Sequence, residues 1–258
     1  MKRFPFGLGS AAIAANALAY LVPAPGLLKT YASERERIPV QRLMVRGQIT
    51  FYGEEAKAAI ASFKSIDIAG ETTLNATLAY KTADQKYAGR CAVEVQAPSG
   101  IAADAGTTSN SGGRIKVVGP DLTSQRVLAV LVCPLLFQKS NVRGDAAPLL
   151  LSFLESVGID PSVESLGRFE KEVVYIIGAK PRDLTRPQFW LGKDSFRPLR
   201  IFGKYEGKIY EARLLDYTLS NANGWHPRQI EVHQGETLLL KFIADTAEPN
   251  VKISDAIF

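Results

Sequence analysis

The last third of the chain, from Phe169 to Phe258, alternates short apolar runs with tight polar turns. Breaks such as Glu206–Gly207 and Gln234–Gly235 are short and rich in turn-forming residues, which is typical of hairpins between antiparallel strands. The spacing therefore predicts a meander of hairpins. The expected strands are Lys171–Ile177, Gln188–Leu191, Pro198–Lys204, Ile209–Tyr217, Arg228–His233 and Leu238–Ala244.

Several of these strands carry apolar side chains on both faces. In the last one, Leu240 and Phe242 point to one side, while Leu239 and Ile243 point to the other. A sheet with one solvated face would instead alternate apolar with polar residues. We therefore expect this sheet to be covered on each side.

The first half of the chain shows the same period of two. Residues Leu43–Tyr52 alternate strictly, and the segments Leu74–Tyr80 and Arg90–Gln96 repeat the pattern, so each is a predicted half-buried strand. The segment Glu54–Lys64 has a helix-forming composition but lies between two predicted strands, so helix and strand both stay open. The stretch Pro98–Gly113, rich in Ala, Gly, Ser and Thr, is expected to be a long mobile hairpin loop.

Two apolar helices are predicted in the middle of the chain. In Ser124–Phe137 the apolar side chains are too dense for a single stripe, so this helix must be buried or must face an apolar partner. Pro134 should end or kink it. The second helix is expected over Pro148–Val157, because Pro is favoured in a first turn and Gly158 is a good terminator.

These two helices admit two interpretations. Either they cap the core of a β domain, or they form the lid of an apolar cavity. For the second interpretation, the candidate cavity residues are the large apolar residues of both helices, together with one tryptophan from a predicted strand. They are Leu128, Leu131, Leu135, Leu136, Leu150, Phe153, Leu154 and Trp190.

The N-terminus indicates export. A basic start, Met1–Arg3, precedes the largely apolar segment Phe4–Leu18, and a small-x-small cleavage signal ends at Ala19. We therefore predict a signal peptide over residues 1–19 and a periplasmic location. Alternatively, the almost uncharged segment Phe4–Leu28 stays in place as a membrane anchor.

Charge and length narrow the function further. The chain holds 31 Lys and Arg against 26 Asp and Glu, and cleavage would remove only Lys2 and Arg3, leaving a net charge of +3. The basic residues are scattered singly, so nucleic-acid binding has no footprint. The chain shows no internal repeat, and we expect a single domain over residues 27–258.

Enzyme signatures are missing from the sequence. The two histidines, His226 and His233, lie seven residues apart on an extended segment, so they would point to opposite faces and could not share a metal. His226 is interpreted as a strand-entry residue. No nucleophile elbow, phosphate loop or His-Glu-x-x-His helix occurs. We expect a non-enzymatic protein with no metal and no cofactor, and keep an envelope hydrolase as an alternative.

The two cysteines, Cys91 on a predicted strand and Cys133 in the first apolar helix, form an even pair. In an exported protein such a pair favours a disulfide. Two buried free thiols are the alternative, because Cys is well tolerated in apolar cores.

The order of the elements resembles a known family. A short amphipathic helix around Leu27–Arg37 is followed by strands, two helices and six more strands. The motif detail lies in the strand–turn–strand Phe189–Arg200, then Leu215–Tyr217, Gly224–Pro227 and the ending Ser254–Phe258. In these features the chain resembles the LolA/LolB-like periplasmic lipoprotein-carrier superfamily, which includes RseB and LppX.

The resemblance implies a mainly β fold with α, in which an incomplete antiparallel β-barrel encloses an apolar cavity under a helical lid or plug. It also implies a carrier that binds a lipid, an acyl chain or an acylated protein. Its partners would be a membrane transporter or an outer-membrane acceptor. An envelope regulatory, sensor or scaffold protein of the same fold, acting through protein contacts, is the alternative.

Overall fold

The computed structural model describes residues 21–38, 40–62, 72–82, 89–96, 105–110, 113–120, 122–137, 146–222 and 224–258, so the predicted signal peptide lies outside the described residues. The helices are α1 (Ala24–Glu36), α2 (Gly53–Ser62), α3 (Thr123–Phe137) and α4 (Ala147–Ser156). The strands are β1 (Arg42–Phe51), β2 (Thr72–Lys81), β3 (Gly89–Val95), β4 (Ala105–Asn110), β5 (Gly113–Val118), β6 (Glu164–Phe169), β7 (Glu172–Ile177), β8 (Gln188–Gly192), β9 (Pro198–Tyr205), β10 (Lys208–Leu215), β11 (Gln229–Gln234) and β12 (Thr237–Pro249).

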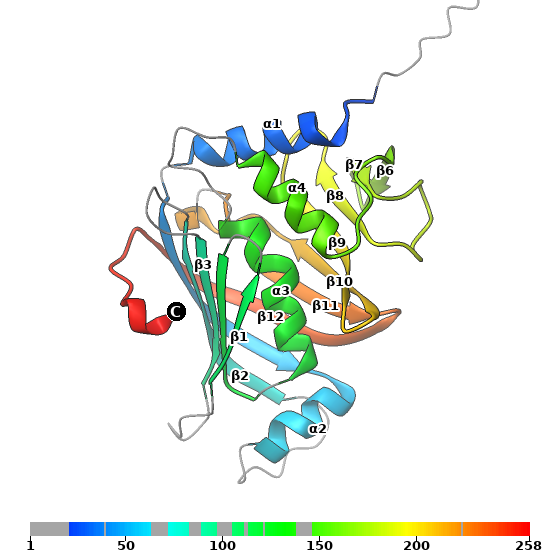
Figure 1. Cartoon of the computed structure of the whole chain (residues 1–258). Coiled ribbons are helices and arrows are strands. Elements are labelled where there is room, and N and C mark those ends of the chain that lie inside the picture. Colours follow the sequence, from blue (N-terminus) through cyan, green and yellow to red (C-terminus); the bar gives the residue numbers. More distant parts are fainter. Residues whose placement is uncertain are drawn as a thin grey trace, which may run out of the picture.

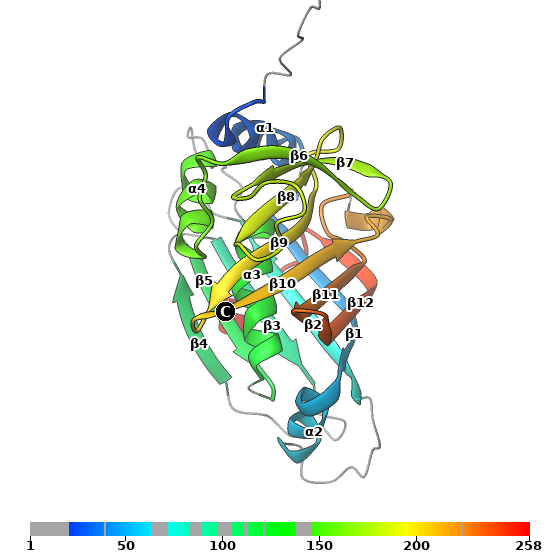
Figure 2. The ribbon, with the colours of Figure 1, turned by 90° about the vertical axis from the view of Figure 1, so that its right-hand side faces the viewer.

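Across these residues the strands form one continuous sheet, in the order β4-β5-β3-β2-β1-β12-β11-β10-β9-β8-β7-β6. Its two edge strands, β4 and β6, are not paired with each other, so the barrel is incomplete, as predicted. The sheet curves around α3, which contacts strands from both of its halves, while α1 and α2 lie at opposite ends (Figures 1 and 2). The prediction of a mainly β fold with helices on an open barrel is confirmed.

The six strands predicted in the last third all form, as β7 to β12. The open segment after β1 is a helix, α2. The helix predicted from Pro148 is α4, and it ends in a Schellman motif. There, Gly158 adopts φ +87° and donates its N–H to Glu155, while the N–H of Ile159 reaches the carbonyl of Leu154 at 3.0 Å.

Three strands were not predicted. β4 falls inside the stretch expected to be a loop, where Gly, Ser, Thr and Asn hide any apolar alternation. β5 enters the sheet between β3 and β4 and pairs with β3 in parallel, from Gly89 opposite Gly113 to Glu94 opposite Val118. The expectation of an all-antiparallel sheet is therefore wrong at this pair. β6 escaped notice because Gly167 interrupts its short apolar pattern.

The helix α3 does not end at Pro134, which was one of the two outcomes expected for this residue. A proline inside a helix removes one backbone donor. The cost is offset here by packing, because Leu131, Leu135 and Leu136 on either side of Pro134 are all buried.

Both faces of the sheet are covered, as the apolar pattern predicted. The helices cover the concave face. On the outer face, Ile253 and Phe258 of the C-terminal segment pack against Ala79 of β2 and Ala92 of β3, and this segment lies beside β3 in Figure 1. Within the described part of the chain, none of the helices has the length and apolarity needed to cross a membrane.

Candidate ligand-binding site

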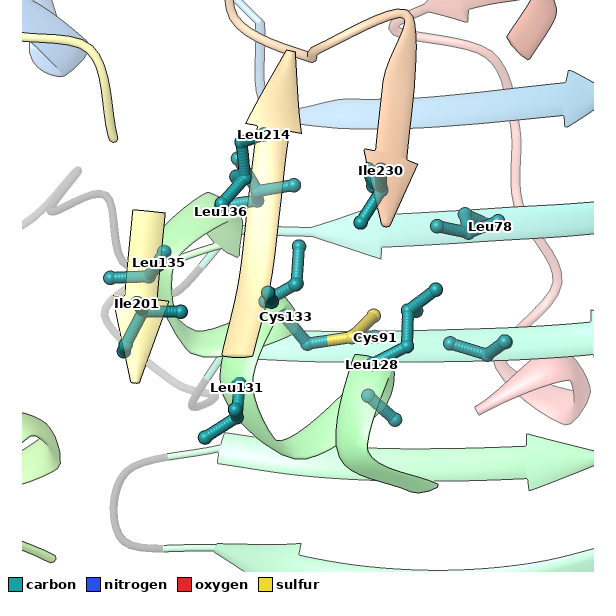
Figure 3. Packing of buried hydrophobic residues seen from close by; sticks show 14 of the residues in the cluster. Leu78, Cys91, Leu128, Leu131, Cys133, Leu135, Leu136, Ile201, Leu214 and Ile230 are labelled. Atoms are coloured by element: carbon teal, nitrogen blue, oxygen red, sulfur yellow. A yellow bond between two sulfur atoms is a disulfide. The ribbon is translucent and has the colours of Figure 1, made fainter. Parts of the chain in front are cut away.

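The concave face of the sheet and the helices α3 and α4 form one apolar core. Seven of the eight residues expected around a cavity lie in it, each at most 1% exposed. Sheet residues such as Ile201, Leu214 and Ile230 face the helix across this core (Figure 3). The seven residues are Leu128, Leu131, Leu135, Leu136, Leu150, Phe153 and Leu154.

The helix α3 approaches the sheet closely at Gly203 of β9. A Cβ atom added there would lie 2.5 Å from Cδ2 of Leu131 and 3.2 Å from Cβ of Val157. Real Cβ contacts are longer than the first of these distances, so glycine is needed for the helix to lie this close. The side chains of α3 thus occupy the space on the concave side that an apolar ligand would need.

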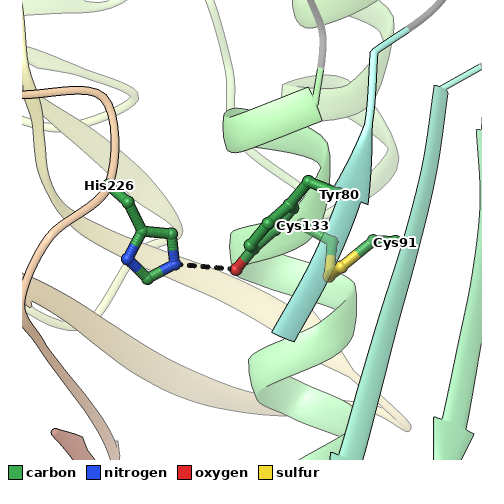
Figure 4. Close-up of a disulfide and its surroundings, with 4 residues drawn as sticks. All are labelled: Tyr80, Cys91, Cys133 and His226. Atoms are coloured by element: carbon green, nitrogen blue, oxygen red, sulfur yellow. Dashed lines mark hydrogen bonds between the residues drawn. A yellow bond between two sulfur atoms is a disulfide. The ribbon is translucent and has the colours of Figure 1, made fainter. Parts of the chain in front are cut away.

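A disulfide joins Cys91 of β3 to Cys133 of α3, as predicted from the even cysteine pair (Figure 4). The hydroxyl of Tyr31 in α1 donates to the carbonyl of Leu135 at 2.5 Å, and Nη2 of Arg35 donates to the carbonyl of Leu136. Carbonyls in the last turn of a helix have no partner within the helix. The C-terminal end of α3 is therefore fixed covalently to the sheet and by hydrogen bonds to α1.

The same region contains a buried histidine. Nδ1 of His226 lies 2.5 Å from the carbonyl of Pro227, which can only accept, so Nδ1 carries the proton and Nε2 accepts from the Tyr80 hydroxyl at 3.0 Å (Figure 4). Burial lowers the pKa of His226 to about 3, so this ring is neutral at ordinary pH. As expected, His226 lies immediately before a strand, β11.

Trp190, the eighth expected cavity residue, lies on the other face of the sheet. Its strand neighbours Phe189 and Leu191 belong to the main core, whereas Trp190 packs with Val174, Ile176 and Leu199. It lines an outer groove of about 630 Å³, in which Arg200 stacks on its ring at 4.8 Å from Cζ to the centroid. The structure therefore does not bring Trp190 together with the other seven residues.

A further cavity of about 230 Å³ lies beside α1, and sequence reasoning did not find it. Its wall includes Arg35, Arg197 and Trp225. Arg35 is 5% exposed, and burial lowers the pKa of its guanidinium. The spacing of Leu27, Tyr31 and Arg35, four residues apart each time, could have shown that this arginine lies on the buried stripe of the helix.

Metal ligation finds no support in the part of the chain that the structure describes, where no group of three or more His, Cys, Asp or Glu side chains could hold an ion. His233 lies 3.0 Å from the Glu231 carboxylate through Nε2. The structure pairs the two histidines with different neighbours, as their opposite orientation predicted.

No family model and no curated protein matches the sequence. Solved structures do match. A domain described as an outer membrane lipoprotein-sorting protein from Vibrio parahaemolyticus aligns with a TM-score of 0.50 and 10% identity, over 88% of this chain and 94% of the other.

A LolA superfamily protein from Nitrosomonas europaea aligns at 16% identity with a TM-score of 0.45, and a DUF1329 family protein from Desulfovibrio piger at 11% identity with a TM-score of 0.48. Each alignment covers 92% of this chain and 98% of the other. From the Vibrio match and the open sheet around α3, we conclude that this chain has the LolA-like fold of outer membrane lipoprotein-sorting domains.

Proposed function

We propose that this chain is an exported, non-enzymatic binding or carrier protein that holds a lipid, an acyl chain or the lipid part of a lipoprotein. The observation that carries the proposal is α3, a helix that is apolar nearly all round and lies against the concave face of an open sheet. The disulfide is typical of an oxidising compartment such as the periplasm. The likeness to a lipoprotein-sorting domain supports the same class of ligand.

In this proposal an acyl chain takes the place of helix side chains against the concave face. Each methylene group removed from water contributes about 0.8 kcal/mol, which offsets the contacts that the helices lose. The C-terminal end of α3 is held by the disulfide and by α1, so it stays in place. The N-terminal part of α3 and the helix α4 are left to move.

The partners follow from the cargo. A carrier must receive its ligand from a donor, which we propose is a membrane transporter, and pass it to an acceptor at the outer membrane. Covalent crosslinking in cells followed by identification of the captured proteins separates this role from that of a sensor, which would instead capture a signalling membrane protein.

A series of fatty acids with 8 to 16 carbons tests the binding function. If the chain enters an apolar site, affinity should rise about fourfold for each added methylene, which corresponds to about 0.8 kcal/mol. Displacement of a fluorescent fatty acid from the purified protein, with any copurified lipid extracted first, gives the dissociation constants. Affinities that do not depend on tail length, or no binding at all, would show that α3 and α4 are simply core.

A further inference from the structure

Arg35 in α1 is a buried charge without a carboxylate. Its Nη1 donates to the carbonyl of Trp225 at 2.9 Å and its Nη2 to that of Leu136, and its Cζ lies 4.5 Å from the centroid of the Trp225 ring. Among the described residues, no acidic group lies within ion-pair distance of it. Buried guanidinium groups normally have a charged partner, because carbonyls and a ring compensate only part of a full charge.

Two buried donors of this cluster have no hydrogen-bond partner in the described chain. They are Nε of Arg35 and Nε1 of Trp225. A buried donor without an acceptor costs roughly 1–3 kcal/mol, so each such group calls for an explanation. Both residues line the same cavity of about 230 Å³ beside α1. Two donors that share one cavity point to an acceptor inside it.

The charge of the cavity wall favours an anion. Its described lining holds three arginines, Arg35, Arg37 and Arg197, against a single acidic residue, Glu34. Nη1 of Arg37 pairs with Glu34 at 2.6 Å, so these two charges largely cancel. Arg197 is exposed, and its Cζ lies 5.1 Å from the ring centroid of Tyr217, another wall residue. Arg35 and Arg197 thus leave the cavity with a positive excess.

We propose that this cavity binds one oxyanion, a carboxylate or a phosphate, through the Nε of Arg35, the indole N–H of Trp225 and the guanidinium of Arg197. Guanidinium groups bind such oxygens through short, charge-assisted hydrogen bonds. A volume of about 230 Å³ suits a head group but not a whole lipid. The proposal rests on the proposed function only for the source of the oxyanion, namely the head group of an acyl ligand.

A purely structural role for Arg35 would be to join α1 to α3. The two Nη atoms already do this, since one of them binds the last turn of α3. The Nε atom and the Trp225 indole contribute nothing to that link. A test must therefore observe these two donors directly.

The indole N–H signal of Trp225 in nuclear magnetic resonance is a suitable probe. The chain has two tryptophans, so Trp190→Phe assigns both signals. The full chain is titrated with inorganic phosphate, acetate, octyl phosphate and octanoate at constant ionic strength. We expect a saturable downfield shift of the Trp225 signal, no comparable shift of Trp190, and no shift with added sodium chloride.

Two variants sharpen the result. Arg197→Met changes an exposed rim residue that should not affect folding, and it should weaken oxyanion binding at least tenfold. Arg228→Met is the matched control, because it removes the same charge from an exposed residue outside the cavity lining and should leave binding unchanged. Arg35→Lys keeps the charge but loses the Nε donor, and it should reduce the Trp225 shift while the far-ultraviolet spectrum stays that of the wild type.

The probes also separate the possible sources. Tighter binding of octyl phosphate than of inorganic phosphate identifies the oxyanion as a lipid head group, and equal binding identifies it as a free anion. Both results support the site. If phosphate shifts Trp225 while tail length has no effect on fatty-acid affinity, the site stands and the carrier function fails. An unchanged Trp225 signal with all four probes, or equal loss in Arg197→Met and Arg228→Met, would overturn the proposal.

Discussion

Cys91→Ala is expected to lower the free energy of unfolding by about 4 kcal/mol. The Cys91–Cys133 bond spans a sequence separation of 42 residues, and closing a loop of that length removes this much unfolded-state entropy in the chain-entropy treatment, less any strain. Both cysteines are fully buried, so the loss is felt inside the main core. Urea denaturation followed by circular dichroism measures the change.

Because the two sulfur atoms make a single interaction, Cys133→Ala should cost about the same, and the double variant should add little to either. Wild-type protein unfolded under reducing conditions is the control, and its stability should match that of the variants. Two titratable thiols in unreduced, unfolded wild type, or fully additive costs, would contradict the assignment.

The bond also matters for the proposed lid. Without it, the C-terminal end of α3 is held only by Tyr31 and Arg35 of α1. We therefore expect Cys91→Ala to speed exchange of a fluorescent fatty acid as well as to lower stability. An unchanged exchange rate would show that ligand entry does not involve this end of the helix.

The second large effect is a loss of stability in mild acid. The pKa of His226 is about 3 in the folded chain and about 6.5 when unfolded. Between these values the unfolded state binds a proton that the folded state does not, so stability falls as the pH falls through 6.5 and continues to fall until about pH 3. The slope approaches 1.4 kcal/mol per pH unit, so we expect a loss of about 2 kcal/mol between pH 7 and pH 5.

His226→Gln isolates this contribution. Glutamine stays neutral and can still accept from Tyr80, so its unfolding free energy should be nearly flat over the same interval. His233→Gln is the matched control and should keep the wild-type dependence. The window is chosen above the range where Glu211 acts, since the bound Arg200 and Arg213 lower the pKa of that carboxyl and its effect appears only in stronger acid. Equal slopes in wild type and His226→Gln would refute this explanation.

The sequence predicted the parts of the fold where residue type follows side-chain direction. The strands β7 to β12 form where apolar runs and turn residues alternate, and α3 forms where apolar residues are dense. The pair β4–β5 was missed because Ala105–Asn110 contains no large apolar residue, so no periodicity could appear. The parallel pairing of β3 with β5 depends on the path of the chain between strands, which a local pattern does not encode.

The candidate site was predicted only in part. Density of leucine located the buried helices, but it could not tell which face of the sheet Trp190 occupies, and that side chain lies away from α3. Arg35 was overlooked because a charged residue in an amphipathic helix is usually exposed. Its position only makes sense once the carbonyls at the end of α3 are seen next to it.

The central claim is that an acyl chain binds between α3 and the concave face of the sheet. A fatty acid carrying a photoreactive diazirine in its tail, crosslinked to the purified full chain and mapped by mass spectrometry, tests it most directly. The account predicts labels on α3 around Leu128 and Leu131 and on facing sheet residues such as Ile201 and Leu214, with competition by unlabelled fatty acid. Labelling confined to the outer groove at Trp190, or none that unlabelled fatty acid displaces, would contradict it.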